Sequence, residues 1–122
     1  MTSLRLAAAL SLLLAPAALQ AQPRPLTGEE RTGLRCAAAF AMVAAGQARG
    51  EPEARRYPPM VPRGREFFVR LSAQLMDDAG LNEAGIKAAA EVEAGALRRD
   101  GGVSSAMPLC LRVLDAQPGL GG

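Results

Sequence analysis

Two cysteines, Cys36 and Cys110, give the clearest indication of chemistry in this sequence of 122 residues. They are far apart in the chain, the sequence contains no histidine, and neither cysteine belongs to a C-x-x-C pair. A zinc site needs more thiolate or imidazole ligands than this, and a redox-active pair needs the short spacing. In an oxidising compartment, two cysteines are enough for one bridge. We therefore expect a structural disulfide between Cys36 and Cys110, and no metal site.

The segment from Arg55 to Arg65 is a second candidate for chemistry, because it concentrates positive charge beside an aromatic ring. It holds four arginines, the only tyrosine and no acidic residue, and it leads into an expected helix. Arginine side chains and the free amides of a helix N-terminus together suit a phosphate or a carboxylate. The alternative is a rigid, proline-rich connection whose arginines pair with acidic residues between Asp77 and Glu93. The candidate binding residues are Arg55, Arg56, Tyr57, Arg63 and Arg65.

Carboxylates are the main option for catalysis. Without histidine, a serine or cysteine nucleophile lacks its usual general base, and no G-x-S-x-G or phosphate-binding glycine loop is present. Five carboxylates lie between Asp77 and Glu93, relieved only by Lys87, and Glu66 stands beside two phenylalanines. Glycan cleavage needs a paired acid and base, which this spacing does not identify, and Glu66 suits the first turn of a helix. We expect no cofactor, and a small cell-envelope hydrolase using carboxylates remains an alternative.

Residues 1–21 have the three parts of a cleavable signal peptide. Arg5 gives a positive start, residues 6–14 form an apolar run, Pro16 ends any helix there, and Ala21 precedes the expected cut. A membrane span needs about 20 apolar residues, so the shorter run favours cleavage over anchoring. No later stretch is long and apolar enough to span a bilayer. We expect a periplasmic or secreted protein without a membrane span after cleavage.

Residues 22–122 have the size of one small domain with nearly balanced charge. Of the 14 basic residues all but Arg5 lie here, against 12 acidic ones. Such a balance provides no extended positive surface of the kind that nucleic acids require. Aromatic residues for base stacking are also scarce, with three phenylalanines, one tyrosine and no tryptophan in the chain. Nucleic acid is therefore not the expected partner.

The periodicity of apolar residues predicts helices throughout this domain, and no alternation typical of strands competes. Thr27 and Glu30 form the pattern of a capping box, and Asn82 is a good N-cap for a later helix. Glycines follow the first three expected helices as stop signals. The expected helices are Gly28–Ala48, Arg63–Ala79, Glu83–Arg99 and a short one that begins at Ser104 or Ser105 and ends near Ala116.

The other segments are expected to be irregular. Four prolines interrupt the stretch from Glu51 to Pro62, and Gln117 to Gly122 has the composition of a loose tail. Both cysteines fall on apolar faces, one in the first helix and one in the last. The sequence thus predicts an all-α bundle of about four helices, clamped by one disulfide between the first and last helices.

These features favour a non-catalytic role for an exported helical domain. The absence of histidine and of any nucleophile motif favours binding over catalysis. A charged, proline-stiffened loop on a helical scaffold is typical of recognition. We therefore expect the domain to bind a protein or an anionic partner in the periplasm. A structural subunit that self-associates through alanine-rich faces is the other alternative.

Overall fold

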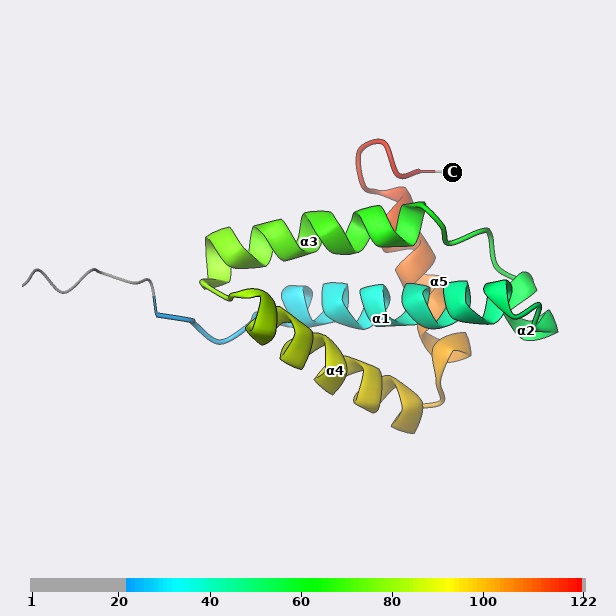
Figure 1. The fold of residues 1–122 in the computed structure, drawn as a ribbon, viewed down its shortest axis with the longest axis horizontal. Helices are drawn as coiled ribbons and strands as arrows, with labels where there is room; N and C mark the ends of the chain where they lie inside the picture. Colours follow the sequence, from blue (N-terminus) through cyan, green and yellow to red (C-terminus); the bar gives the residue numbers. More distant parts are fainter. Residues whose placement is uncertain (1–21, 122) are drawn as a thin grey trace, which may run out of the picture.

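The computed structural model describes residues 22–121, and this part of the chain is all-helical (Figure 1). It contains α1 (Gly28–Ala48), α2 (Pro52–Arg55), α3 (Arg63–Ala79), α4 (Glu83–Arg99) and α5 (Val103–Asp115). The predicted all-α fold is confirmed, and the single turn of α2 is added to the four expected helices. Residues 1–21, where we expect the signal peptide, lie outside the described range.

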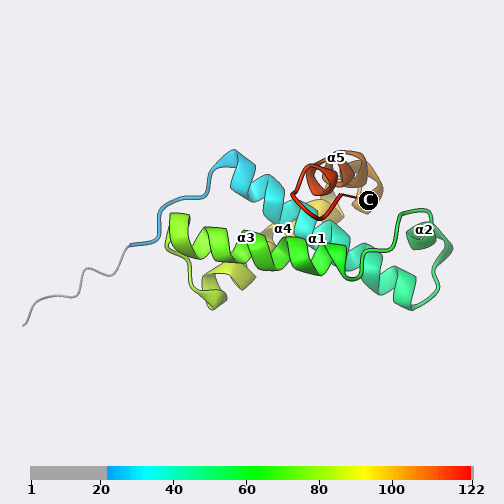
Figure 2. The same ribbon diagram turned by 90° about the horizontal axis from the view of Figure 1, so that it is seen from above.

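Helix α1 is the centre of the fold, because every other helix packs against it while α3, α4 and α5 make few contacts with one another. Helix α3 runs antiparallel to α1, and α4 returns along the other side of α1 (Figure 1). The two helices meet at the turn of residues 80–82 and then diverge, so that they form a V over α1. Helix α5 crosses α1 at a steep angle on a further side, as the view from above shows (Figure 2).

The helix starts follow from local hydrogen bonds. At α1, the Thr27 hydroxyl accepts from the Glu30 amide and the Glu30 carboxylate accepts from the Thr27 amide, which confirms the predicted capping box. Asn82 caps α4 by accepting from the amide of Gly85 at 2.8 Å. The start of α5 differs from the expectation, because Gly102 and not a serine is its N-cap residue. The Ser105 hydroxyl instead donates to the carbonyls of Asp100 and Gly102 in the preceding turn.

The core joins α1 to α3, α4 and α5. The rings of Phe40 and Phe67 meet edge to face with centroids 5.4 Å apart, a geometry that adds about 0.5–1.5 kcal/mol to the effect of burial. Helix α3 starts very close to α1, since a Cβ on Gly64 would lie 2.9 Å from the Cβ of Phe40. A smaller apolar cluster fills the closed end of the V; it consists of Leu34, Leu75, Ala79 and Ile86.

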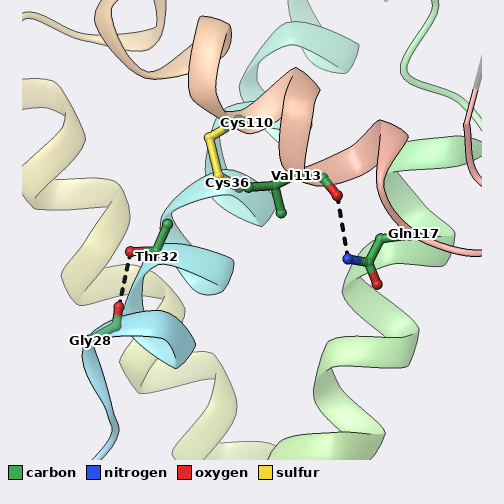
Figure 3. The surroundings of a disulfide bond; sticks show 6 residues. All are labelled: Gly28, Thr32, Cys36, Cys110, Val113 and Gln117. Atoms are coloured by element: carbon green, nitrogen blue, oxygen red, sulfur yellow. Dashed lines mark hydrogen bonds between the residues drawn. A yellow bond between two sulfur atoms is a disulfide. The ribbon is translucent and has the colours of Figure 1, made fainter.

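The disulfide ties the central helix to the last one. Cys36 on α1 and Cys110 on α5 are bonded, with their Cα atoms 5.1 Å apart, and both are buried (Figure 3). Seventy-four positions separate the two cysteines in sequence, so the bridge encloses most of the domain. The predicted pairing of first and last helices is thereby confirmed.

The connection between α1 and α3 is held by one side chain of α1. The Gln47 amide nitrogen lies 2.9–3.2 Å from the carbonyl oxygens of Ala54, Tyr57 and Pro58, and its oxygen accepts from the Met60 amide at 3.0 Å. These bonds satisfy backbone groups that the prolines exclude from regular helix. The segment is therefore ordered by the hydrogen bonds of the half-buried Gln47 side chain, with only the short α2 as regular structure.

The C-terminal residues differ from the loose tail that composition predicts. Leu120 is buried in the core, and the Arg63 guanidinium donates to its carbonyl oxygen at 2.6 Å. Arg70 donates to the carbonyl of Pro118 in the same turn. Composition alone misses this anchoring because a single leucine among glycines and a proline makes no periodic pattern.

Candidate functional site

A groove of about 690 Å³ lies between α3 and α4, with α1 as its floor. A second recess of about 300 Å³ continues it toward the start of α3. The two share Ala38, Ala41, Phe68 and Ala90 in their walls, so they form one continuous depression. The groove exists because α3 and α4 both pack on α1 but diverge from their connecting turn (Figure 1). Its volume is in the range of ligand-binding clefts in proteins.

The floor of the groove is formed by α1, mainly by alanines together with Met42. Ala38, Ala41 and Ala45 line it at three- and four-residue spacing, which places them on one side of the helix. Ala41 and Ala45 are exposed, although they lie in the helix that every other helix contacts. Because alanine projects only a methyl group, another helix can approach the α1 backbone closely here.

The walls contain large apolar side chains that are only partly covered. Phe68 and Met76 of α3 retain 36% and 39% of their exposure, and Val61 at the far end retains 67%. On α4, Ile86 and Ala90 face them across the groove. The Ser72 hydroxyl is buried in the α3 wall and has no hydrogen-bond partner among the described residues. Contact with an apolar ligand would cover the exposed surface of Val61, Phe68 and Met76, which is favourable because it removes apolar surface from water.

Charges of both signs follow the α4 side of the groove. Glu83, Lys87 and Glu91 repeat at four-residue spacing, and Arg98 lies two turns further on. Among the described residues, no ion pair involves any of these four side chains. Arg65 adds a positive charge at the start of α3. The first turn of α3 and the last turn of α4 lie at the wide end of the V, so that end has two cations (Figure 1).

The five binding residues expected from the sequence do not form one surface. Arg65 lines the groove, whereas Arg63 donates to Asp115 at 2.6 Å and to the Leu120 carbonyl, and thus anchors the C-terminus. Tyr57 packs partly against the core. The exposed residues Arg55 and Arg56 belong to α2 and its cap.

The alternative ion pairs that the sequence suggests for these arginines are not the ones observed. Arg56 pairs with Glu53 at 2.9 Å and Arg63 pairs with Asp115, so neither contacts the acidic residues of α3 and α4. The reason is topological. Helix α3 begins at Arg63 beside the C-terminal turn (Figure 1), so Arg63 lies within reach of Asp115. Of the expected set, only Arg65 is placed beside the groove.

The two carboxylates that line the groove are not arranged as a paired acid and base. Glu83 and Glu91 both line the groove, but eight residues of α4 separate them, which is about 12 Å along a helix axis. Glycosidases hold their two carboxyl groups about 5–9.5 Å apart. Among residues 22–121, no group of three or more acidic or cysteine side chains is arranged to hold a metal ion. Glu83 and Glu91 therefore do not have the spacing of a glycosidase pair.

The shifted pKa of Glu30 has a structural cause. Two hydrogen bonds from the Arg24 guanidinium, at 2.7 and 3.0 Å, and one from the Thr27 backbone lower the pKa of Glu30 to about 2. Glu30 lies at the start of α1, where it also completes the capping box. The charge of Glu30 therefore holds the N-terminal segment through the ion pair with Arg24, and Glu30 does not line the groove.

No known protein family, curated protein or solved structure matches this chain. None of the described helices is long and apolar enough to cross a membrane. The groove is therefore the feature from which we infer a function. One feature of the sequence indicates the groove. Alanines occupy the exposed side of α1, at Ala41 and Ala45, as well as the side that is buried in the core.

Proposed function

We propose that the protein is an exported, non-catalytic binding domain, which holds an apolar helical segment of a protein partner in the groove between α3 and α4. The observation that carries this proposal is the groove itself, about 690 Å³ in volume and lined by alanines, Phe68, Met76 and Ile86. An apolar groove between helices is the site that amphipathic helices use, with anchors at one-turn spacing.

The properties of the groove favour a polypeptide over a lipid. Its floor of alanines suits close approach of a second helix backbone. Its α4 side has two acidic and two basic residues. A lipid headgroup with charge of one sign would be complementary to only half of them. A helix with an apolar stripe and flanking charges of both signs satisfies floor and rim together. Arg65 and Arg98 at the wide end further favour an acidic residue at one end of that helix.

Export is supported by the sequence of residues 1–21 and by the buried disulfide, since such bonds persist in oxidising compartments. We place the protein in a periplasm or outside the cell. Protein from a secreting host should have the mass of a chain that begins near Gln22. A product that retains Met1 and remains in the membrane fraction would contradict this assignment.

The groove can be tested with a labelled amphipathic peptide that has leucines at one-turn spacing. Fluorescence anisotropy of dilute oxidised protein should show saturable binding of this peptide. Ala41→Glu places a charge on the groove floor and should weaken binding by about tenfold or more, because the carboxylate would be buried against the apolar face. Ala73→Glu makes the same substitution at an exposed position of α3 that does not line the groove, and it should bind normally.

Three outcomes would overturn the proposal. One is that the wild-type protein does not bind the peptide. Another is that Ala41→Glu binds it as well as wild type does while circular dichroism shows a folded helical protein. The third is that a fluorescent fatty acid binds in the groove and the peptide does not, which would make the ligand a lipid.

A further inference from the structure

We infer that the helix occupying this groove is α4 of a second copy of the chain, in a two-fold symmetric dimer with the two α4 helices antiparallel. The inference rests on the proposed function, because it assigns an occupant to the same groove. It is carried by the order of charges along α4 and by the small side chains between them.

The charges on the groove side of α4 are complementary to themselves when the helix is reversed. Read from Glu83 through Lys87 and Glu91 to Arg98, their signs alternate. An antiparallel copy brings Glu83 opposite Arg98 of the second copy, and Lys87 opposite Glu91 of the second copy. The first pairing is centred between Ala90 and Glu91 and the second on Ala89. A two-fold axis at Ala90 therefore leaves the pairs offset by one and two residues, which is about 1.5–3 Å along the helix and within the reach of these long side chains. A two-fold interface requires this reciprocity, in which each contact occurs twice.

The parallel arrangement is disfavoured by the same charges. It would place Glu83 opposite Glu83 of the second copy and Lys87 opposite Lys87 of the second copy. Opposed like charges destabilise an interface and are a common means of excluding wrong registers. The charges therefore select both the direction and the register of the two helices.

The surface around these charges suits helix-to-helix contact. Ala90 and Ala94 lie between the charged residues, and Ala41 lies on the α1 floor beside them. With only methyl groups at these positions, two helices can approach to the short end of the usual 8–10 Å separation. The partly exposed Phe68 and Met76 would be covered in the dimer. Burial of these side chains supplies the affinity, and the charges supply the register.

The charge pattern has a simpler explanation that an experiment must exclude. Glu and Lys four residues apart also support a single helix. No ion pair of the single chain involves Glu83, Lys87 or Glu91 among the described residues, so the side chains are available for a second copy. Exchange of two charges distinguishes the two explanations, because only intermolecular pairing makes self-association depend on them.

Sedimentation equilibrium of the oxidised protein, from micromolar to millimolar concentration, should show a monomer–dimer equilibrium. Lys87→Glu should weaken the dimer by about tenfold, because two attractive contacts per dimer become repulsive. The double variant Lys87→Glu/Glu91→Lys should restore most of the affinity, since each copy again meets an opposite charge. Arg112→Glu changes the net charge equally at an exposed position of α5 and should dimerise as wild type does.

The outcomes separate this inference from the proposed function. A protein that stays monomeric at millimolar concentration but binds the amphipathic peptide would overturn the dimer and leave the binding groove intact. A monomer that also fails to bind the peptide would overturn both. A dimer that Lys87→Glu leaves unchanged, or that the double variant fails to rescue, must use another surface and would overturn the inference.

Discussion

Breaking the bond between Cys36 and Cys110 should remove a large part of the stability of the fold. The bridge spans 74 positions, and the loop-entropy model gives about 4.5 kcal/mol for a loop of this length at 25 °C. Domains of this size have a total of about 5–15 kcal/mol. For about 100 residues, a loss of 4.5 kcal/mol lowers the melting temperature by roughly 20–30 °C. Reduced protein should therefore be folded only marginally.

Urea unfolding followed by circular dichroism, with and without reductant, measures this loss directly. The double variant Cys36→Ala/Cys110→Ala should have a low midpoint in both conditions, which controls for any effect of the reductant. Helix α5 should lose amide protection first, because apart from the bridge it packs chiefly on α1. If reduction leaves the midpoint unchanged, the loop-entropy reasoning is refuted and packing alone holds α5 in place.

Three further predictions concern packing and polar contacts. Glu30→Gln should lower the free energy of unfolding at neutral pH. Because the pKa of Glu30 is about 2 in the folded state against an ordinary value of 4.5, this loss relative to wild type should shrink as the pH falls from 4.5 through 2. Urea titrations at acid pH measure the difference. Gly64→Ala should cost about 1–3 kcal/mol, because its Cβ would lie 2.9 Å from that of Phe40, whereas Gly28→Ala, with open space around it, should be tolerated in the same melts. Gln47→Ala should cost about 2–3 kcal/mol and speed protease cleavage within residues 51–61, since the carbonyls of Tyr57 and Pro58 and the amide of Met60 lose this partner.

The helices could be predicted from the sequence because their signals are local. The capping box at Thr27, the N-cap at Asn82 and the stop at Gly80 each depend on a few neighbouring residues, and the structure places the boundaries of α1, α3 and α4 where these signals indicate. The disulfide could also be predicted, since two cysteines on inward faces leave one pairing. Signals of this kind can be recognised without knowledge of the tertiary packing, because each depends only on residue types and their spacing.

The groove could not be predicted, because it depends on the angle between two helices. Neither Phe68 nor Met76 differs in sequence from a core residue, and α3 presents them outward only because α4 diverges. The arginine-rich segment shows the converse difficulty. Arg63 has the residue type expected at a binding site, but it contacts Asp115 and Leu120, which are 52 and 57 positions away from it in sequence. Contacts over such distances are set by topology, which residue types alone do not specify.

The most direct measurement of the binding groove is an NMR titration of protein with labelled alanine methyl groups. Ala38, Ala41 and Ala45 on the floor and Ala90 on the α4 side report contact at the groove, whereas Ala73 lies outside it. On addition of the amphipathic peptide, we expect saturable shifts of the four groove methyls and an unchanged Ala73. Shifts spread evenly over all alanines, or absent from the groove methyls at saturating peptide, would contradict it.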